Sequence, residues 1–548
     1  MNSPTARTRT TAEAFVEQLI AQGVDTVFGI PGVQTYPLFD ALARVRDQIE
    51  VVVPRHEQAC AYMAMGYAQS TGRPGVCSVV PGPGILNAAA GLLTAAGTST
   101  PVVCLTGEVP TPYMGRGLGH VHEMPDQLGT LRSFLKHAEN VLHPAQAGAR
   151  LAEAFAQATS GRPGPVAVAA PWDVLGASAP VPEPTTPHTH PAPQVAAGDL
   201  AAAADLLRAA RNPMIMVGSG ARGAAEEVRR LAELLQAPVV SLRGGRGVVA
   251  NSHPLGFTCA EGFTRWADTD LLLSIGTRRE LEWFRWPDRP AGLRTVNVDI
   301  DPRQQARLRP DVGLTGDAAQ VTRGLLDVLG PEAGRPDRTG EFARARAGKR
   351  AEIARLKPHA DHLAAIRAAL PADGFFVEEV SQVGFSSYFA FDVEEPRRFI
   401  TSGHQSTLGF GFPTALGVKA AHRTSPVVSV TGDGGFQFAL QELATAVQFG
   451  LGVVTVVFDN GAYGNVRADQ QRLFGRPFAS DLRNPDLLAL ARSFGAEAVQ
   501  AQDPDALGDA VEAALAKDLP TVVHVPMPLD MDRSPWPFLA PAPTTRGA

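Results

Sequence analysis

Residues 426–465 read PVVSVTGDGGFQFALQELATAVQFGLGVVTVVFDNGAYGN, and this stretch decides which fold we expect. Two runs rich in β-branched residues, at 426–431 and 453–458, have the length and composition of buried strands. An Ala- and Leu-rich segment of helical character separates them, and a turn containing glycine follows each run. Strands and helices that alternate in this way predict a parallel sheet covered by helices on both faces.

The two turns carry Asp433, in the segment GDGGF, and Asn460, in the segment DNG. In a doubly wound sheet, ligands collect at the carboxyl ends of the strands, where both turns lie. The side-chain oxygens of Asp433 and Asn460 suit a divalent cation, and the glycines let backbone N–H groups approach phosphate. Either segment alone would favour an ordinary strand-to-helix turn. The two together favour a cation that bridges a diphosphate.

The same alternation runs through the 548 residues, which exceed the usual size of a single domain. Two seams interrupt it: the proline-rich segment APVPEPTTPHTHPAPQ at 179–194, and GPEAGRPDRTG at 330–340. We therefore expect an α/β protein of three doubly wound parallel-sheet domains, at residues 1–178, 195–330 and 371–530.

Composition excludes several classes of protein. The chain has 49 basic and 55 acidic residues without a long run of one sign, which argues against a nucleic-acid partner. Its four cysteines form no CxxC pair and cannot build a disulfide framework. The first residues lack the apolar core of a secretory signal, and the apolar runs are too short to cross a bilayer. We expect a cytoplasmic protein that acts on small molecules, without a membrane or nucleic-acid partner.

The segment from GDGGF to NGAYGN resembles the thiamin diphosphate motif of the acetolactate synthase and 2-oxo acid decarboxylase superfamily. The resemblance extends over residues 10–530 and includes GIPG at 29–32, PGPG at 81–84 and GEVP at 107–110. It implies that the first domain binds the pyrimidine ring and the third binds the diphosphate. It also implies that Mg²⁺ is held by Asp433, the Asn460 side chain and the Ala462 carbonyl.

The resemblance further implies a set of cofactor-binding residues. They are Gly32, Pro83, Asn87, Gly384, Ser386, Ser406, Leu408, Gly432, Asp433, Gly434, Gly435, Asn460, Ala462, Tyr463, Gly464 and Asn465. Leu408 matches the bulky apolar residue that wedges the two cofactor rings into a V shape. In SQVGFSS, at 381–387, Phe385 and Ser386 replace the Gln-His pair usual in the family.

Glu57, in the segment RHEQ at 55–58, follows an apolar strand and opens a helix. A single Glu at such a position is most often solvated. In the family that it resembles, however, this carboxylate hydrogen-bonds the aminopyrimidine ring of the cofactor. A carboxylic acid can exchange a proton with the ring nitrogen and so act by relay as a general base, which a glutamine cannot do.

Four histidines, His56, His120, His122 and His404, are candidate acid/base residues over the cofactor, together with Glu57 as the main catalytic residue. Imidazole suits this role because its ordinary pKa lies near neutrality. For each histidine taken alone, a surface or core position is the alternative. A metal cluster of His120, His122 and Glu123 is disfavoured because no fourth ligand is evident.

The middle domain contains GSGARG at 218–223, which fits GxGxxG after a strand. The next strand, in PVVSLRGG at 238–245, ends without the acidic residue that a nicotinamide dinucleotide site needs. Acetolactate synthases bind FAD in this domain, but their Met-His-Gly and Arg-Phe-Asp-Asp-Arg segments are replaced here by AEGFTRW and TRRELEW. FAD is therefore disfavoured, and we expect a mainly structural domain.

The resemblance implies an enzyme that decarboxylates a 2-oxo acid through an enamine intermediate and joins it to a second carbonyl compound. One alternative is simple decarboxylation to an aldehyde, because the loop GRGLGHVHEMPDQ at 115–127 resembles that of guanidino-2-oxo acid decarboxylases. Another is a non-catalytic relative that only binds thiamin diphosphate, against which Glu57 argues. In this family the active sites lie between subunits, which implies a homodimer or homotetramer.

Overall fold

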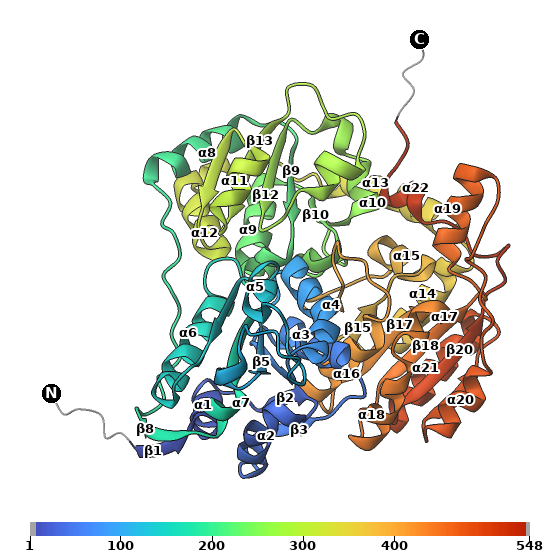
Figure 1. The fold of residues 1–548 in the computed structure, drawn as a ribbon. Helices are drawn as coiled ribbons and strands as arrows, with labels where there is room; N and C mark the ends of the chain where they lie inside the picture. The colour runs from blue at the N-terminus through green and yellow to red at the C-terminus, as the bar shows by residue number, and fades with distance from the viewer. Residues whose placement is uncertain (1–6, 544–548) are drawn as a thin grey trace.

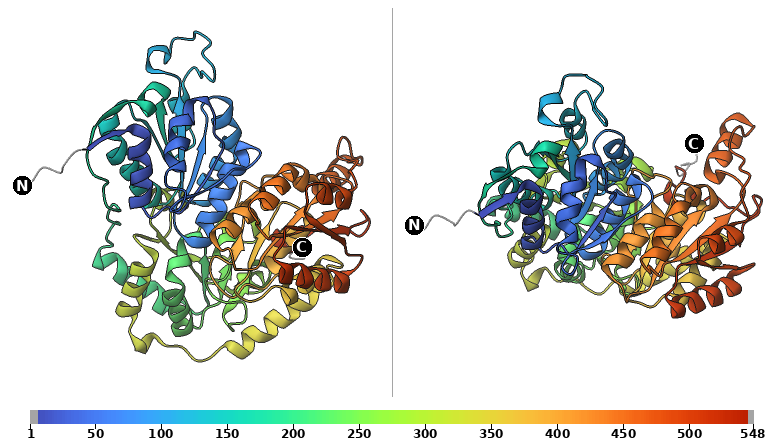
Figure 2. Two further views of the ribbon diagram at one scale, coloured as in Figure 1. Left: turned by 90° about the horizontal axis from the view of Figure 1, so that it is seen from below. Right: turned by 60° about the horizontal axis from the view of Figure 1, so that its bottom comes forward.

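Three parallel sheets form the framework of the computed structural model, which describes residues 7–543. Each sheet has six strands and is covered by helices, which confirms the expected α/β architecture. Figure 1 shows the first domain in blue to teal, the central domain in green and the third domain in orange to red. The other views show that each domain contacts the other two (Figure 2).

The first sheet has the strand order β3-β2-β4-β5-β7-β6, and all its strands are parallel. Its strands are β2 (Thr26–Gly29), β3 (Glu50–Val52), β4 (Gly75–Val79), β5 (Val102–Glu108), β6 (His137–Asn140) and β7 (Val166–Pro171). Its helices are α1 (Thr11–Ala21), α2 (Tyr36–Ala43), α3 (Glu57–Thr71), α4 (Pro83–Thr98), α5 (Gln127–Arg132), α6 (Ala147–Thr159) and α7 (Trp172–Gly176).

The third sheet repeats this order as β16-β15-β17-β18-β20-β19, so the outer domains share one topology. Its strands are β15 (Phe375–Glu378), β16 (Phe399–Ile400), β17 (Val427–Gly432), β18 (Val454–Asp459), β19 (Glu497–Gln500) and β20 (Thr521–Pro526). Its helices are α15 (Gln382–Ala390), α16 (Gly411–Ala421), α17 (Asp433–Gln437), α18 (Leu443–Gln448), α19 (Gly464–Phe474), α20 (Leu487–Ser493), α21 (Pro504–Lys517) and α22 (Trp536–Leu539). Strands β17 and β18 are mostly apolar, and all but the last residue of each is buried, because both faces of the sheet are covered.

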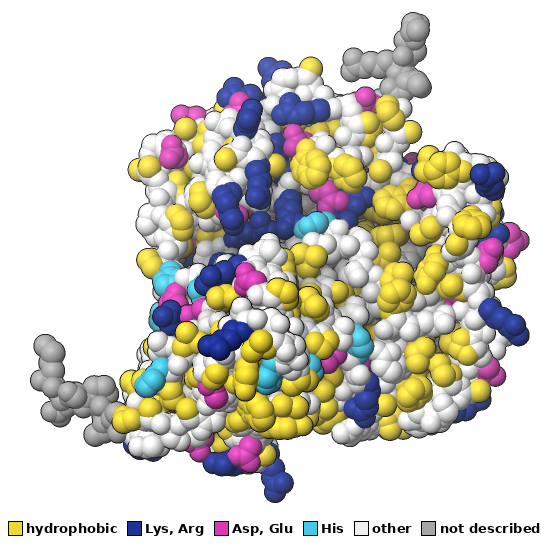
Figure 3. Space-filling view, in the orientation of Figure 1, with side chains coloured by type: hydrophobic (Ala, Val, Ile, Leu, Met, Phe, Trp, Pro, Cys, Tyr) yellow, Lys and Arg dark blue, Asp and Glu magenta, His cyan; other side chains and the backbone are white. Residues whose placement is uncertain are grey.

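The central sheet has a different order, β11-β10-β9-β12-β13-β14, which is that of dinucleotide-binding folds. Its strands are β9 (Pro213–Val217), β10 (Val239–Ser241), β11 (Gly256–Thr258), β12 (Leu271–Ile275), β13 (Arg294–Asp299) and β14 (Val312–Thr315). Its helices are α8 (Ala197–Ala209), α9 (Ala225–Leu235), α10 (Cys259–Phe263), α11 (Pro302–Leu308) and α12 (Ala318–Leu329), and α13 (Thr339–Ile353) and α14 (His359–Ala369) lead to the third domain. Basic side chains gather on this domain around a hollow that faces the first domain (Figure 3).

The proline-rich segment 179–194 is mostly extended, as predicted, but its first residues belong to a strand. This strand, β8 (Ser178–Val181), pairs antiparallel with β1 (Arg7–Thr10) in a separate two-stranded sheet. Proline is tolerated there because each strand of such a ribbon has a free edge. Within residues 7–543, no helix is long and apolar enough to span a bilayer.

Helices α3 and α16 join the first and third domains. Twelve of the fifteen residues of α3 are buried, which is typical of a helix packed on all sides. Gly66 of α3 faces the Thr414 carbonyl, and Gly417 of α16 faces the Met63 carbonyl. A Cβ atom at either glycine would lie only 2.1 or 2.0 Å from the opposing oxygen, so the backbones approach as closely as glycine permits.

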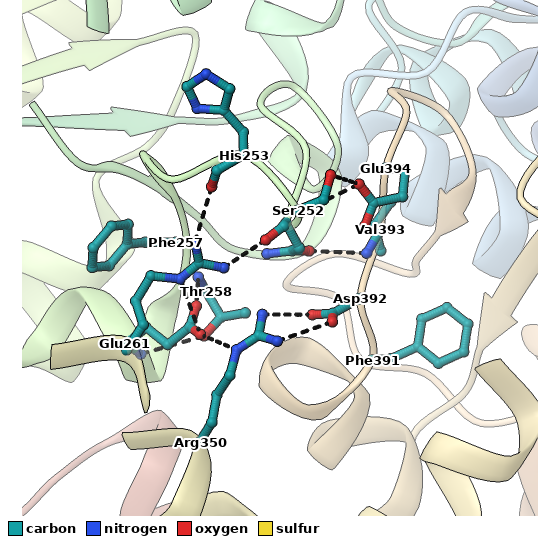
Figure 4. A network of polar contacts seen from close by, with 12 residues as sticks. Ser252, His253, Phe257, Thr258, Glu261, Arg350, Phe391, Asp392, Val393 and Glu394 are labelled. Carbon is teal, nitrogen blue, oxygen red and sulfur yellow. Dashed lines mark hydrogen bonds and ion pairs between the residues drawn. The ribbon is translucent and has the colours of Figure 1, made fainter. Parts of the chain in front are cut away.

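A network of charged residues joins the central domain to the third (Figure 4). Arg350 of α13 binds Glu261 of α10 at 2.7 Å and Asp392, in the loop after α15, at 3.0 Å. Glu261 also accepts the Thr258 N–H in a capping box. Burial would raise the pKa of Glu261, but Arg346 and Arg350 outweigh it and lower that pKa. The carboxylate therefore remains charged between the two domains.

Candidate functional site

Glu57 is the first residue of α3, directly after the turn that follows β3. His56 caps this helix, because its Nδ1 accepts the Gln58 N–H at 3.2 Å. A carboxylate is favoured at this end of a helix by the exposed N–H groups. Asn87 of α4 donates its Nδ2 to Glu57 Oε2 at 3.1 Å. Two predicted residues, Glu57 and Asn87, thus lie together, while His56 has a local role in capping.

Glycines lie in the turns around this carboxylate. A Cβ at Gly84 would lie 2.6 Å from the Val80 side chain and 3.7 Å from Glu57 Oε1, so Gly84 allows close packing on Val80 beside Glu57. Gly82 has a φ of 62°, in the left-handed region, and its Cα lies against the His122 carbonyl. Pro83 follows as the first residue of α4, a position that favours proline. Gly32 lies against Val80, so the turns after β2 and β4 meet.

His122 is held by a residue that the sequence did not single out. Gln34 is fully buried, donates its Nε2 to the Val121 carbonyl at 2.8 Å, and places its Oε1 2.8 Å from His122 Nδ1. Because an amide oxygen only accepts, Nδ1 is the donor in this contact, and Nε2 is the ring nitrogen that remains for proton exchange. Of the four histidines, His122 therefore has the orientation of an acid/base group next to the Glu57 region.

The other residues of this loop stabilise the loop itself. Glu123 accepts N–H groups of Gly117, Gly119 and His120 at 2.7–3.0 Å. His120 packs on the Tyr113 ring, with the centroids 4.9 Å apart. Within the described chain, no cluster of three or more His, Cys, Asp or Glu side chains is placed to hold a metal ion.

His404 lies in a different place, a cavity of about 390 Å³ between the central domain and its neighbours. The turn Gly218-Ser219-Gly220 and Arg222, Arg278 and Arg397 also line this cavity. Arg278 contacts the His404 ring. Desolvation and the nearby guanidinium groups of Arg278 and Arg243 lower the pKa of His404 to about 4. The imidazole is therefore neutral at pH 7. It lines the same cavity as the arginines and contacts Arg278.

Burial also acts on Arg222 in this cavity. Together with the charge of Arg397, it lowers the pKa of Arg222 to about 9. The guanidinium group donates to the Gly244 carbonyl at 2.8 Å. The cavity is therefore positively charged, and its chemistry suits an anion.

Asp433 and its neighbours form the second half of the site, at the carboxyl ends of β17 and β18. Asn484 donates to both Asp433 Oδ2, at 2.6 Å, and Asp459 Oδ1, at 2.7 Å. Burial, aided by Asp459 and opposed by Asn484, raises the pKa of Asp433. Burial would also raise the pKa of Asp459, but hydrogen bonds from His524, the Gly461 N–H and Asn484 outweigh it and lower that pKa.

Asn460 and Ala462 lie in the adjoining turn. Asn460 Oδ1 accepts the Ala462 N–H at 3.0 Å, and its Nδ2 donates to Asp532 at 2.8 Å. The segment that contains Ala462 is held from the other side, where the Tyr463 N–H donates to the Ser480 carbonyl at 2.8 Å. Within residues 7–543, neither Lys nor Arg forms an ion pair with Asp433. Carboxylate, amide and carbonyl oxygens at one sheet edge fit a Mg²⁺ ion, whose charge would offset the repulsion between the two carboxylates.

Other predicted cofactor residues surround this edge. Gly432 ends β17, and Gly434 lies where a Cβ would meet the Tyr463 ring at 2.8 Å. Gly435 lies against Glu379, whose Oε1 would be 2.3 Å from a Cβ. These close approaches explain why the sequence has glycine in this turn.

Four more of the predicted cofactor-binding residues lie between β15 and β17. The Gly384 N–H donates to Ser381 Oγ at 2.9 Å, which caps α15. Ser386 is buried, and its hydroxyl donates to the Gln382 carbonyl at 2.7 Å within the same helix. Ser406 adopts a φ of 46° in the turn that leads to Leu408, and both are partly buried.

Two further residues lie at the start of α19. Gly464 is its first residue, and Asn465 accepts a hydrogen bond from Trp536 Nε1 at 2.8 Å. Asn465 is therefore tied to the C-terminal part of the chain.

Several residues at the site escaped sequence reasoning. Glu379 accepts the Gly409 and Gly411 N–H groups and the Thr431 hydroxyl at 2.5–3.1 Å, and it is buried directly behind Gly435. Two adjacent acids after the apolar strand in FFVEE were a usable signal for Glu379. Asn484 and Asp532 gave no signal, because they reach the site from loops without a strand-end pattern. Gln34 lies in the short helix Val33–Thr35 directly after the GIPG turn that follows β2, and that position was a usable signal.

The comparisons with known proteins agree with this geometry. Models of the thiamine pyrophosphate enzyme family match in three parts: the N-terminal TPP binding domain at residues 9–130, the central domain at 200–325 and the C-terminal TPP binding domain at 379–525. A probable 2-ketoarginine decarboxylase from Pseudomonas aeruginosa is 35% identical over 529 residues, which cover 95% of this chain and 94% of that protein.

Acetolactate synthases are similar over almost the same length. A probable large subunit from Methanocaldococcus jannaschii is 32% identical, covering 94% of this chain and 91% of that protein. The large subunit of isozyme 3 from Escherichia coli K12 is 33% identical, covering 92% of both. With its three domains matched in order and its length covered by these relatives, the chain belongs to the thiamine pyrophosphate enzyme family.

Proposed function

We propose that this protein is a thiamin diphosphate- and Mg²⁺-dependent enzyme that decarboxylates a 2-oxo acid and joins the remaining acyl unit to a second carbonyl compound. The observation that carries the proposal is Glu57. Its Oε2 is fixed by Asn87, and its Oε1 lies near Gly84 in the first turn of α4. A protein that only bound the cofactor would need the oxygen ligands at Asp433 and Asn460, but not a proton-exchanging acid.

Bound thiamin diphosphate would supply an electron sink for the carbanion that remains when CO₂ leaves. Asp433, the Asn460 amide oxygen and the Ala462 carbonyl would hold the cation at the diphosphate. Glu57 would exchange a proton with the pyrimidine ring through Oε1. His122 would exchange protons with the substrate through Nε2, since Gln34 occupies Nδ1.

The second candidate function is decarboxylation that ends with protonation and release of an aldehyde. Its support is an imidazole at His122, oriented so that Nε2 can deliver a proton, and the similarity to a protein named as a probable 2-ketoarginine decarboxylase. The similarity to acetolactate synthases supports ligation. Both functions share the first step and the residues described above.

Product analysis tests these functions. The purified protein with Mg²⁺ and thiamin diphosphate is incubated with pyruvate, longer 2-oxo acids and a guanidino 2-oxo acid, and CO₂, aldehydes and 2-hydroxy ketones are measured. Ligation products support the first function, and aldehyde as the sole product replaces it with the second.

A Glu57→Gln variant should keep Asn87 bound and lose about 10²–10⁴-fold in kcat. Glu512→Gln, on the exposed side of α21, is the matched control. If wild type and Glu57→Gln both turn over every substrate only at the background rate, the proposal that the protein is an enzyme is refuted.

We also propose a homodimer or homotetramer with active sites between subunits. Within residues 7–543, no hydrogen bond joins Glu57 or Asn87 to Asp433 or Asn460, which lie in different domains. Exposed apolar side chains border both halves: Leu86 and Leu93 on α4, Phe438 after α17, and Val466, Leu473 and Phe474 on α19. Light scattering of the protein in solution measures the assembly, and an active monomer would refute it.

Two finer predictions concern the cofactors and the compartment. The arginine-lined cavity suits an anion, yet the segments that mark a flavin site are replaced, so we infer that FAD is not required for turnover. A visible flavin absorption band in the active protein would contradict this. We infer a cytoplasmic location from the four cysteines, all of which are buried and unpaired.

A further inference from the structure

The segment after β20, which we call the C-terminal strap (Met527–Leu539), crosses the edge of the third sheet that carries the candidate metal ligands. The Met527 N–H donates to the Asp459 carbonyl at 2.8 Å. At its far end Trp536, in α22, packs on Phe385 with ring centroids 5.3 Å apart and donates to Asn465. Figure 1 shows α22 next to α10 and near the start of α19.

Asp532 is the residue of the strap that reaches the candidate metal site. Its side chain is only 7% exposed. Oδ2 accepts Asn460 Nδ2 at 2.8 Å, and Oδ1 lies 3.0 Å from His359 Nε2. His359 belongs to α14 and is completely buried. The carboxylate of Asp532 is thus fixed on one side by α14 and presents its other oxygen to Asn460.

This arrangement determines which way the Asn460 amide faces. An amide has nearly the same shape in its two orientations, so neighbouring donors and acceptors decide between them. In the observed orientation Nδ2 faces the Asp532 carboxylate and Oδ1 accepts the Ala462 N–H at 3.0 Å. If the amide turned over, its oxygen would face a carboxylate oxygen and its NH₂ would face an N–H group. Both contacts would then be repulsive.

Gly464 provides the room for this contact. A Cβ at position 464 would lie 2.4 Å from Asn460 Nδ2 and 2.7 Å from Asp532 Oδ2. Gly464 is also the first residue of α19, where alanine would favour the helix more than glycine does. Glycine at position 464 therefore lowers the helix propensity of α19. The structure explains its presence, because a larger residue would disrupt the hydrogen bond between Asn460 and Asp532.

We propose that Asp532 is a positioning residue that holds Asn460 Oδ1 toward a divalent cation shared with Asp433 and the Ala462 carbonyl. This inference rests on the proposed function, because it presumes that these oxygens bind the cation. Asp532 itself does not contact the cation; it acts through the Asn460 amide. Partners of this kind change metal affinity by about 10–100-fold when they are replaced.

The test measures binding of Mn²⁺, a paramagnetic substitute for Mg²⁺, to the full-length protein in the presence of thiamin diphosphate. Free Mn²⁺ is followed by electron paramagnetic resonance, so the readout does not depend on activity. Asp532→Asn should weaken Mn²⁺ binding about 10–100-fold. The control Asp530→Asn, at an exposed residue of the same strap, should leave binding within about twofold.

Two further variants separate positioning from folding. Gly464→Ala should weaken Mn²⁺ binding to a similar extent, although alanine favours α19. The double variant Asn460→Asp with Asp532→Asn reverses the direction of the hydrogen bond and keeps the total charge, so it should recover most of the affinity lost by Asp532→Asn. Because Asn460→Asp also adds a charged ligand, the double variant is compared with Asn460→Asp alone, in which two carboxylates face each other. Positioning predicts tighter binding by the double variant, whereas a merely structural role for Asp532 predicts weaker binding.

The outcomes are distinguishable. Wild-type protein that binds no Mn²⁺ would refute the proposed function and this inference with it. Normal wild-type binding with unchanged binding by Asp532→Asn, or by Gly464→Ala if Asp532→Asn fails to fold, would refute the inference alone. Failure of the double variant to recover any affinity would also overturn it.

Discussion

The close contact between α3 and α16 predicts that replacing Gly66 by alanine destabilises the protein, although alanine is the better helix former. A Cβ at Gly66 would lie 2.1 Å from the Thr414 carbonyl oxygen. That oxygen belongs to the backbone of α16 and cannot rotate away, so the two helices must separate. A useful control is Gly348→Ala in the middle of α13, where a Cβ would meet no atom within 4 Å.

The expected size follows from two opposing effects. Overpacking a buried contact costs about 1–3 kcal/mol, and the backbone oxygen at Gly66 points to the upper end. Alanine regains about 1 kcal/mol of helix propensity. The net loss at Gly66 is therefore about 2 kcal/mol, whereas Gly348→Ala should gain about 1 kcal/mol. A loss of that size lowers Tm by about 4–8 °C in a domain of this length.

The assay is thermal unfolding followed by fluorescence, with residual 2-oxo acid turnover measured after heating. Gly66→Ala should unfold earlier than wild type and Gly348→Ala slightly later. Since α3 begins with Glu57, separation of the helices should also lower kcat below the unfolding temperature. A Gly66→Ala protein as stable as Gly348→Ala would show that the helices do not approach as closely as described.

Three other substitutions test separate features. Burial, opposed in part by the Gly409 and Gly411 N–H groups, raises the pKa of Glu379 to about 7, so this carboxyl should cost the wild type about 3 kcal/mol of stability as pH rises from 4.5 to 7. Glu379→Gln should have a flatter profile of Tm against pH, and an unchanged profile would contradict this. Replacing Glu261 by Gln leaves Arg346 without a carboxylate and Arg350 with Asp392 alone. It should lower Tm most near pH 7, and the difference from wild type should vanish as pH falls through the depressed pKa of Glu261. His122→Ala should lower kcat about 10²-fold while His120→Ala changes it less than about threefold, and equal effects would refute the assignment of the proton donor.

The strands and the seams could be predicted from sequence because each leaves a local pattern. Runs such as VVSV before Asp433 are mostly apolar and are buried at every position, since both faces of a parallel sheet are covered. The composition of the proline-rich segment 179–194 predicts an extended linker, and only its first residues belong to a strand. Such local patterns do not predict the order of the strands, because that order depends on which runs pair across the sheet. Only the structure shows that the outer domains share one order and the central domain has another.

The residues of the site also differ in whether a local sequence pattern predicts them. Asp433, Asn460 and Glu57 directly follow strands or open a helix, so their neighbours in sequence predict their place. Asn484 contacts Asp433 from a loop 51 residues further along the chain, and Asp532 contacts Asn460 from a loop 72 residues further along. Nothing in their local sequence distinguishes them from ordinary loop residues.

The histidines show how tertiary contacts decide a role that sequence leaves open. His122 and His404 were equivalent candidates because each lies in a loop near a recognised motif. Gln34 leaves one ring nitrogen of His122 free, whereas Arg278, 126 residues before His404 in the chain, helps to keep that ring neutral. The partners come from distant segments, and it is they that set the protonation and orientation of each ring.

Contacts within one chain also tie the segment that carries Glu57 to the third domain. The buried Glu442 carboxylate, just beyond the turn that carries Asp433, accepts the Arg55 N–H with both oxygens, at 3.1 and 3.0 Å. Arg55 lies two residues before Glu57, so the third domain fixes the backbone that presents the Glu57 carboxylate. Together with the packing of α3 on α16, this bond makes the position of Glu57 depend on the third domain. A disturbance of that domain should therefore change proton transfer at Glu57 even when the metal ligands are intact.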